Sequence, residues 1–167
     1  EYDSAFFDKR SKMIHYRPKT LVINNLEFDH ADIFDDLKAI QTQFHHCVRT
    51  VPSLGRIIYP NDSQNVKMVI DQGCWSEKET LADAGCLKNQ SSEQTENADW
   101  QSKKLTAEGS EFEILDTNNH CLAKVNWQMI GDHNINNAVA AMAAARHVGV
   151  LPKHSAEALN HFKGVKR

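Results

Sequence analysis

The sequence predicts an α/β fold in which a mixed sheet is flanked by helices and carries an added antiparallel portion. Three features lead to this prediction. A short apolar run precedes a helical apolar stripe, two later segments alternate between apolar and polar residues around a turn, and an alanine-rich stretch follows them. Strands followed by helices favour an α/β domain, and an alternating pair of strands adds an antiparallel hairpin.

The first strand is expected within Lys19 to Leu26, where an apolar run has polar flanks. A helix is predicted to follow, with Asp29 as its N-cap and an end before Pro52 and Gly55. Its evidence is a single apolar stripe at helical spacing, made by Ile33, Phe34, Leu37, Ile40, Phe44 and Val48.

Further strands are predicted at 56–59 and 66–70, and 88–99 is expected to be an exposed loop. The segments 111–115 and 122–127 alternate around a turn, which predicts a hairpin with one solvated face. An alanine-rich helix is expected from Asn134, with Gly149 as its C-cap, and a last helix at about 154–162.

Composition restricts the classes of function. The 167 residues suit one domain or the larger part of one, and the net charge of -3 gives no basic field for nucleic acid or an anionic membrane. No apolar stretch reaches membrane-spanning length and no signal peptide is visible, so a cytoplasmic location is expected. The four cysteines lack metal-site spacing and are expected to be free thiols.

Polar residues at 24–32 are expected where the first strand ends and the helix begins. Ligands bind at this edge of open α/β sheets. His30 would lie in the first helical turn, where the positive helix end favours a neutral ring that can bind a metal, and Asp29 or Asp32 could orient it. From spacing alone, the favoured interpretation is that Asp29 and Asp32 only cap the helix and that His30 is a solvated bystander.

A second polar stretch, Gly131 to Asn137, opens the alanine-rich helix. Asparagine amides offer a donor and an acceptor together, which matches one edge of adenine, and His133 could stack on a base or ribose. Capping by Asp132, Asn134 or Asn136 is again an alternative. A phosphate-binding GxxxxGK[ST] loop is absent from the sequence.

Taken together, several collinear segments resemble the Mur ligase family of ATP-dependent peptide ligases. They are residues 1–12, 24–36, Phe44 to His46 with Val48 to Pro52, 131–149 and 162–167. The match is weakest between about residues 60 and 125. Ordered segments over nearly the whole chain are more specific than either polar motif, so the resemblance favours function over capping at both.

The resemblance implies a partial central ATP-binding domain. The implied reaction uses ATP to activate the carboxylate of UDP-N-acetylmuramate as an acyl phosphate, which the amine of the tripeptide L-Ala-γ-D-Glu-meso-diaminopimelate then attacks, in peptidoglycan recycling. By this resemblance His30 would bind Mg²⁺ and serve catalysis, and His133, Asn134 and Asn137 would hold adenine. Arg167, in a basic ending that lies near the nucleotide in relatives, would contact ATP.

Some family features are not found in residues 1–167. The phosphate loop and a magnesium-binding glutamate are expected upstream of Glu1, together with a UDP-binding domain, and an amine-binding domain is expected after Arg167. The chain alone is therefore expected to be inactive, to bind nucleotide weakly at most, and to self-associate. Fifteen residues beyond His30 stands His45, so the carbamylated lysine of some relatives is not predicted.

Two alternatives remain at this point. One is a non-catalytic nucleotide- or protein-binding module that has the same central fold. The other, a metal-dependent hydrolase, has little support because no second group of metal ligands accompanies His30.

Overall fold

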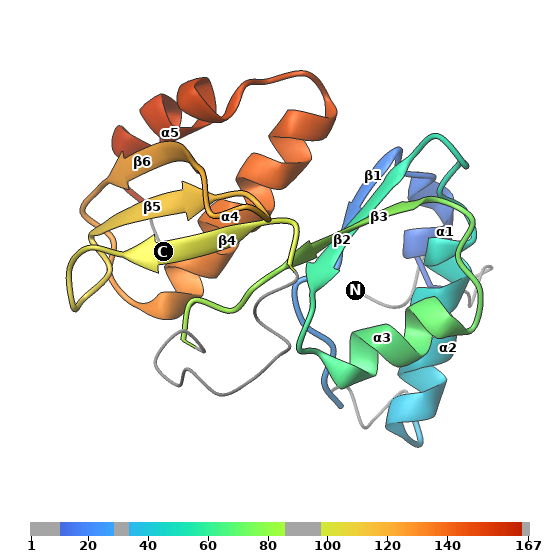
Figure 1. The fold of residues 1–167 in the computed structure, drawn as a ribbon. Coiled ribbons are helices and arrows are strands. Elements are labelled where there is room, and N and C mark those ends of the chain that lie inside the picture. Colours follow the sequence, from blue (N-terminus) through green and yellow to red (C-terminus); the bar gives the residue numbers. More distant parts are fainter. Residues whose placement is uncertain (1–10, 29–33, 86–97, 165–167) are drawn as a thin grey trace.

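The computed structural model describes residues 11–28, 34–85 and 98–164. Its first half contains a parallel sheet of three strands in the order β1 (Thr20–Val22), β2 (Arg56–Pro60) and β3 (Glu77–Leu81). Leu21 pairs with Ile57, which pairs with Lys78. All three strands therefore end at the same edge of the sheet, which faces the middle of the molecule in Figure 1.

Helices connect these strands, because parallel neighbours need a crossover. The short α1 (Met13–Tyr16) precedes β1, α2 (Leu37–Val48) leads from β1 to β2, and α3 (Gln64–Asp71) leads from β2 to β3. The prediction of a strand at 66–70 was wrong, since this segment lies inside α3. Its buried residues Val66, Val69 and Ile70 have helical spacing, which places them together on one face.

Helices cover both faces of the parallel sheet. Along β2, Ile57 and Tyr59 point into a core shared with α2 and α3, whereas Ile58 between them points into a second core on the opposite side. Alternation along a strand produces this division. The second core contains α4 (Asp132–His147), whose Ala138 and Val139 are buried there.

A separate antiparallel sheet of three strands occupies the other half of the molecule: β4 (Gln101–Lys104), β5 (Glu111–Leu115) and β6 (Cys121–Asn126). The predicted hairpin is confirmed by the pairing of β5 with β6. The two sheets meet through a single bridge between Leu81 and Trp100, so the described strands form two sheets. The expected α/β class with an antiparallel addition is confirmed.

Helix α4 lies between the two sheets (Figure 1) and packs on both. Its alanines allow this close approach because they have no side chain beyond Cβ. The helix ends at His147 with Val148 as its C-cap, one residue before the predicted Gly149, which follows with a φ of 96°. Helix α5 (Pro152–Asn160) then packs against β6.

Several boundaries differ from the predictions. The N-cap of α2 is Asp36, whose carboxylate accepts a hydrogen bond of 2.7 Å from the Ala39 N–H, and not Asp29. Strands β3 and β4 were not predicted, because neither has an alternating apolar pattern. Of the expected loop at 88–99, only Ala98 and Asp99 are described, and Ala98 is buried.

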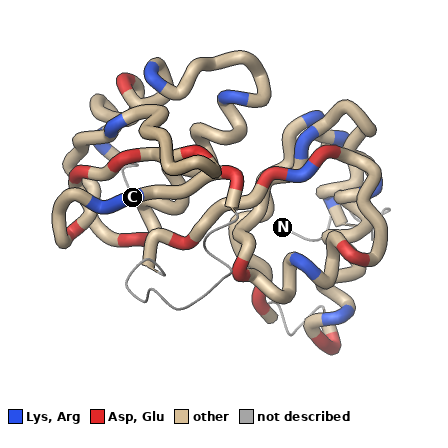
Figure 2. Tube along the Cα trace, viewed as in Figure 1, with Lys and Arg blue, Asp and Glu red and all other residues tan. Residues whose placement is uncertain are grey.

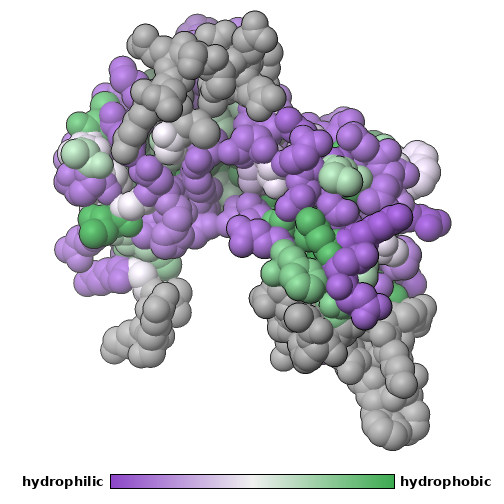
Figure 3. Space-filling model, turned by 90° about the horizontal axis from the view of Figure 1, so that it is seen from below, coloured by the Kyte–Doolittle hydropathy of each residue, from purple (hydrophilic) through white to green (hydrophobic). Residues whose placement is uncertain are grey.

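The surface is mainly polar and of mixed charge. Both halves of the trace carry Lys and Arg as well as Asp and Glu (Figure 2), in line with the small net charge. The face seen from below in Figure 3 is mostly hydrophilic, with small hydrophobic areas on both halves of the molecule. Among the described residues, no helix has the length and apolar character to cross a membrane.

Candidate nucleotide site

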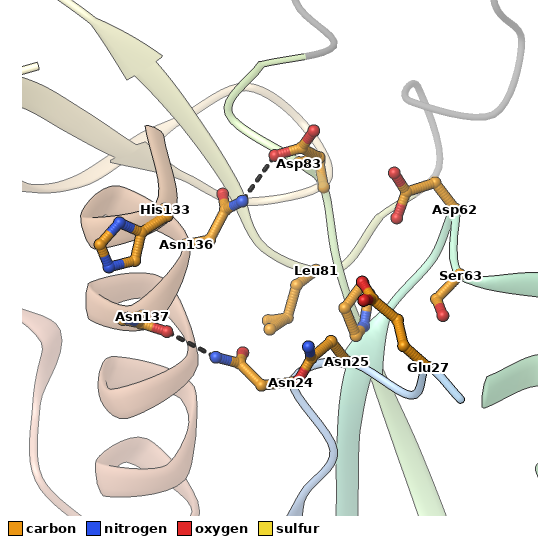
Figure 4. A pocket seen from close by; sticks show the side chains of 12 residues that line it. Asn24, Asn25, Glu27, Asp62, Ser63, Leu81, Asp83, His133, Asn136 and Asn137 are labelled. Carbon is orange, nitrogen blue, oxygen red and sulfur yellow. Dashed lines mark hydrogen bonds between the residues drawn. The ribbon is translucent and has the colours of Figure 1, made fainter. Parts of the chain in front are cut away.

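A polar cavity of about 610 Å³ lies at the carboxyl edge of the parallel sheet. Each strand contributes the residues that follow or end it, and the beginning of α4 closes the opposite wall (Figure 4). The lining residues are Asn24, Asn25, Glu27, Pro60, Asp62, Ser63, Leu81, Ala82, Asp83, His133, Asn136 and Asn137. This is the edge where ligands bind in open α/β sheets, and the volume is that of a small-molecule site.

Two side-chain hydrogen bonds join α4 to the strand edge across this cavity (Figure 4). The Asn24 amide donates to Oδ1 of Asn137 at 2.5 Å. The Asn136 amide donates to Oδ1 of Asp83 at 2.5 Å and its own oxygen accepts from the Ala84 N–H at 2.9 Å. The segments after β1 and β3 are thereby fixed to the same helix.

The first turn of α4 is also anchored to the antiparallel sheet. Lys104, at the end of β4, forms an ion pair of 2.5 Å with Asp132, the first residue of the helix. The Gly131 N–H donates to the carbonyl of Glu108 at 2.7 Å. A carboxylate at a helix N-terminus is stabilised by the helix dipole, so both the dipole of α4 and the Lys104 ammonium stabilise the Asp132 carboxylate.

A second cavity of about 720 Å³ adjoins the same part of α4 and is mainly apolar. Aromatic and aliphatic side chains line it, together with polar groups of the helix: Trp127, Met129, His133, Asn134, Asn137, Ala138, Ala141, Leu159, Phe162 and Gly164. His133 and Asn137 line both cavities. An apolar space with a few amides suits a planar base, whereas the polar cavity suits charged groups.

The structure brings together part of the predicted site. His133 and Asn137 line both cavities and Asn134 lines the apolar one, where its amide also donates to the Ile130 carbonyl at 2.7 Å. His30 and Arg167 lie outside the described residues. The stretch before His30 does reach the polar cavity, through Asn24, Asn25 and Glu27.

Asn136 and Asp83 were not predicted as site residues. Asn136 belongs to the polar stretch that opens α4, so its sequence position was the available signal. Asp83 follows β3, which has no apolar alternation, and no local pattern marks its position. Only the folded sheet places it beside α4.

The oxygen ligands of the polar cavity fit a hard cation such as Mg²⁺, which is usually bound by one or two carboxylates and by substrate phosphates. Glu27, Asp62 and Asp83 supply carboxylates to this cavity. In the described part of the chain, no three His, Cys, Asp or Glu residues are grouped closely enough to hold a metal ion by themselves.

Near the cavity, burial raises the pKa of the Tyr59 phenol, and the charges of Cys74, Asp71 and Asp99 raise it further. Tyr59 immediately precedes Pro60 in the cavity wall, but its side chain belongs to the core under α2 and α3. The phenol therefore stays neutral at physiological pH and is a packing residue.

An α/β domain with a cavity between the strand edge and a helix N-terminus is typical of nucleotide-binding proteins. The family profile described as Mur ligase middle domain matches residues 1–145. The chain belongs to this family.

Individual relatives narrow the comparison from the family to one kind of ligase within it. The UDP-N-acetylmuramate–L-alanyl-γ-D-glutamyl-meso-2,6-diaminoheptandioate ligase of Escherichia coli (strain K12) is 52% identical over 167 residues, which are 100% of this chain and 34% of the relative. The crystal structure of the corresponding ligase from Neisseria meningitides matches with 50% identity and a TM-score of 0.85, over 100% of this chain and 47% of that one. A murein peptide ligase from Psychrobacter arcticus matches with 44% identity and a TM-score of 0.82, over 100% of this chain and 32% of that one. The chain thus spans about a third of the length of the curated relative.

Proposed function

We propose that this chain is part of the central ATP-binding domain of a ligase that joins L-Ala-γ-D-Glu-meso-diaminopimelate to UDP-N-acetylmuramate. The observation that carries the proposal is the pair of adjoining cavities on α4, one apolar and one polar, which share His133 and Asn137. The 52% identity to a ligase named for these substrates supports the choice of reaction. On this proposal the enzyme works in the cytoplasm and other domains bind the UDP group and the amine.

In the proposed reaction the γ-phosphoryl group of ATP is transferred to the carboxylate of UDP-N-acetylmuramate, and ADP is released. The free amine of the tripeptide attacks the resulting acyl phosphate, an amide forms and inorganic phosphate leaves. Phosphoryl transfer depends on positioning and on stabilisation of charge more than on covalent help from the protein. The chain must therefore hold the base and the phosphates at a fixed separation.

The apolar cavity is the proposed adenine site. Trp127 and Phe162 offer aromatic surface there, and Asn134 and Asn137 offer amide donors and acceptors for the edge of a base. His133 stands between the two cavities, where a ribose or the first phosphate would pass. Arg167 is proposed to contact the nucleotide as well.

The polar cavity is the proposed site of the reacting groups. His30, with cavity carboxylates and the phosphates, is proposed to hold Mg²⁺, which when bound neutralises charge between the phosphate and the attacking carboxylate. Without a cation, the carboxylates of Glu27, Asp62 and Asp83 would repel the phosphates, so a bound cation is needed to offset their charge.

The test uses the full-length protein that contains this chain, with ATP, Mg²⁺, UDP-N-acetylmuramate and the tripeptide. We expect UDP-N-acetylmuramoyl-tripeptide by mass spectrometry, with ADP and phosphate formed in equal amounts. Parallel reactions with L-alanine examine the amine used by more distant relatives, which are named UDP-N-acetylmuramate–L-alanine ligases. ATP binding without amide formation from any amine would reject the proposal and favour a non-catalytic module.

A further inference from the structure

We propose that Asn136 and Asp83 form a positioning clamp that fixes α4 to the end of β3 and so sets the separation between the two cavities. The clamp comprises these two side chains and the Ala84 N–H. The proposal rests on the proposed function, because the separation matters only if one nucleotide occupies both cavities.

Asn136 uses both halves of its amide in the clamp. Its Nδ2 donates to Oδ1 of Asp83 at 2.5 Å, and its Oδ1 accepts from the Ala84 N–H at 2.9 Å. The same Asp83 oxygen also accepts from the Gly85 N–H at 3.3 Å. Asn136 is therefore bonded to the segment after β3 by one side-chain and one backbone contact, at the point where the strand has ended.

The clamp supplies an anchor that the other contacts of α4 do not. Lys104 ties the first residue of the helix to β4, and Asn24 ties Asn137 to the segment after β1. The Asn136 contacts tie α4 to the segment that follows β3. Because Asp83 lines the polar cavity and α4 carries the amide residues of the apolar one, a shift at this contact changes the distance between the two cavities.

This arrangement predicts that loosening the clamp slows the reaction more than it weakens nucleotide binding. The amide contacts to the base move with α4, since Asn134 and Asn137 are on the same helix as Asn136, and the aromatic surface of Trp127 and Phe162 lies outside it. The reacting groups are aligned by the strand edge, and misalignment of about 1 Å can cost roughly 100-fold in rate. A residue that only stabilises the fold would instead lower the amount of active enzyme, with unchanged kinetic constants for the folded fraction.

The chemistry of the pair gives a selective set of variants. Asn136→Asp keeps the acceptor for Ala84 but replaces the donor with a carboxylate beside Asp83, so the two repel. Adding Asp83→Asn restores a donor, because the new amide can donate to the new carboxylate. Asn136→Ala removes both bonds without adding charge. Asn118→Asp, in the exposed turn between β5 and β6, adds the same charge far from the cavity.

The experiment measures kcat, the KM for ATP and thermal unfolding of the full-length protein and these variants in the ligase assay. We expect kcat to fall about tenfold or more in Asn136→Asp, with the KM for ATP within about threefold of wild type. We expect the double variant to recover to within about threefold of Asp83→Asn, and Asn118→Asp to behave as wild type.

The outcomes separate the two proposals. An active wild type with an unchanged Asn136→Asp overturns the clamp alone, and so does a double variant that stays well below the kcat of Asp83→Asn. A wild type that forms no amide overturns the proposed function and the clamp with it. If Asn136→Asp fails to fold, Asn136→Ala and the double variant decide by the same criteria: slow Asn136→Ala with a recovered double variant supports the clamp, and the reverse rejects it.

Discussion

Asn24, which lies just beyond β1, donates a hydrogen bond of 2.5 Å to Asn137 on α4, although 113 positions separate them in the sequence. Both residues line the polar cavity, and Asn137 also lines the apolar one. The orientation of the Asn137 amide is therefore set by a residue that follows the first strand.

Replacing Asn24 by Ala is expected to raise the KM for ATP by about three- to tenfold in the full-length enzyme. The Asn137 amide would lose the partner that orients it, and one such hydrogen bond is worth about 1 kcal/mol. Steady-state kinetics with varied ATP measure the effect. Thr42→Ala, at an exposed position of α2, is the control, and equal KM values for the two variants would refute the role of Asn24.

Replacing His30 by Ala is expected to lower kcat roughly 100-fold while the KM for ATP changes little, since the proposed adenine contacts lie on α4. Rapid-quench measurement of acyl phosphate and ADP formation examines the chemical step directly. His46→Ala, at an exposed position of α2, removes a histidine without touching either cavity. An unchanged kcat in His30→Ala rejects the metal-binding role.

Gly55 allows the chain to turn tightly into β2, and its replacement by Ala is expected to lower the free energy of unfolding by about 1–3 kcal/mol. A Cβ there would lie 2.7 Å from Val51 Cγ1, 2.8 Å from the Lys19 carbonyl oxygen and 2.9 Å from the Pro52 carbonyl oxygen. Two of these neighbours are backbone atoms that cannot rotate away. Urea unfolding measures the change, with the exposed Ser53→Ala as control, and equal stabilities would contradict the prediction.

Cys47 is expected to react with iodoacetamide much more slowly than Cys121. Cys47 is buried and Cys121 is exposed, and burial raises the pKa of the Cys47 thiol while its hydrogen bond with Thr50 offsets part of this rise. A raised pKa keeps the thiol neutral to higher pH, so the reactive thiolate forms later in a pH series. Peptide mass spectrometry at pH 7 to 9 gives the order of labelling. Equal alkylation rates for Cys47 and Cys121 in the folded protein would contradict the prediction, because they would show that the Cys47 thiol is accessible to the reagent.

Local sequence patterns predicted elements that carry their own periodicity. The apolar stripe of α2, the alternating β5–β6 hairpin and the alanine-rich α4 were found because each buries one face against a large partner. In contrast, the segment 66–70 was predicted as a strand but is helical, because a short apolar run rich in Val and Ile is compatible with either a strand or a buried helix. The segment forms a helix because it connects β2 to β3, and these parallel strands need a crossover.

Strand β3 shows why part of the fold and of the site was missed. Its side chains Glu77 and Glu79 both form ion pairs with Arg56 on β2, so polar residues hold the strand in the sheet. Such pairing joins positions far apart in the sequence, and no local pattern reveals it. Asp83, which follows this strand, was missed for the same reason.

The sequence by itself determined the α/β class, the family and the polar stretch that opens α4, because periodicity, composition and collinear motifs are properties of neighbouring residues. Only the tertiary structure decided that Asn24, Asp83 and Asn136 meet around one cavity and that α4 separates it from an apolar one. The physical reason is that parallel strands distant in sequence end at a common edge of the sheet. Side-chain hydrogen bonds there hold the segments after the strands to α4. A sequence pattern can locate this helix along the chain but cannot place it in space.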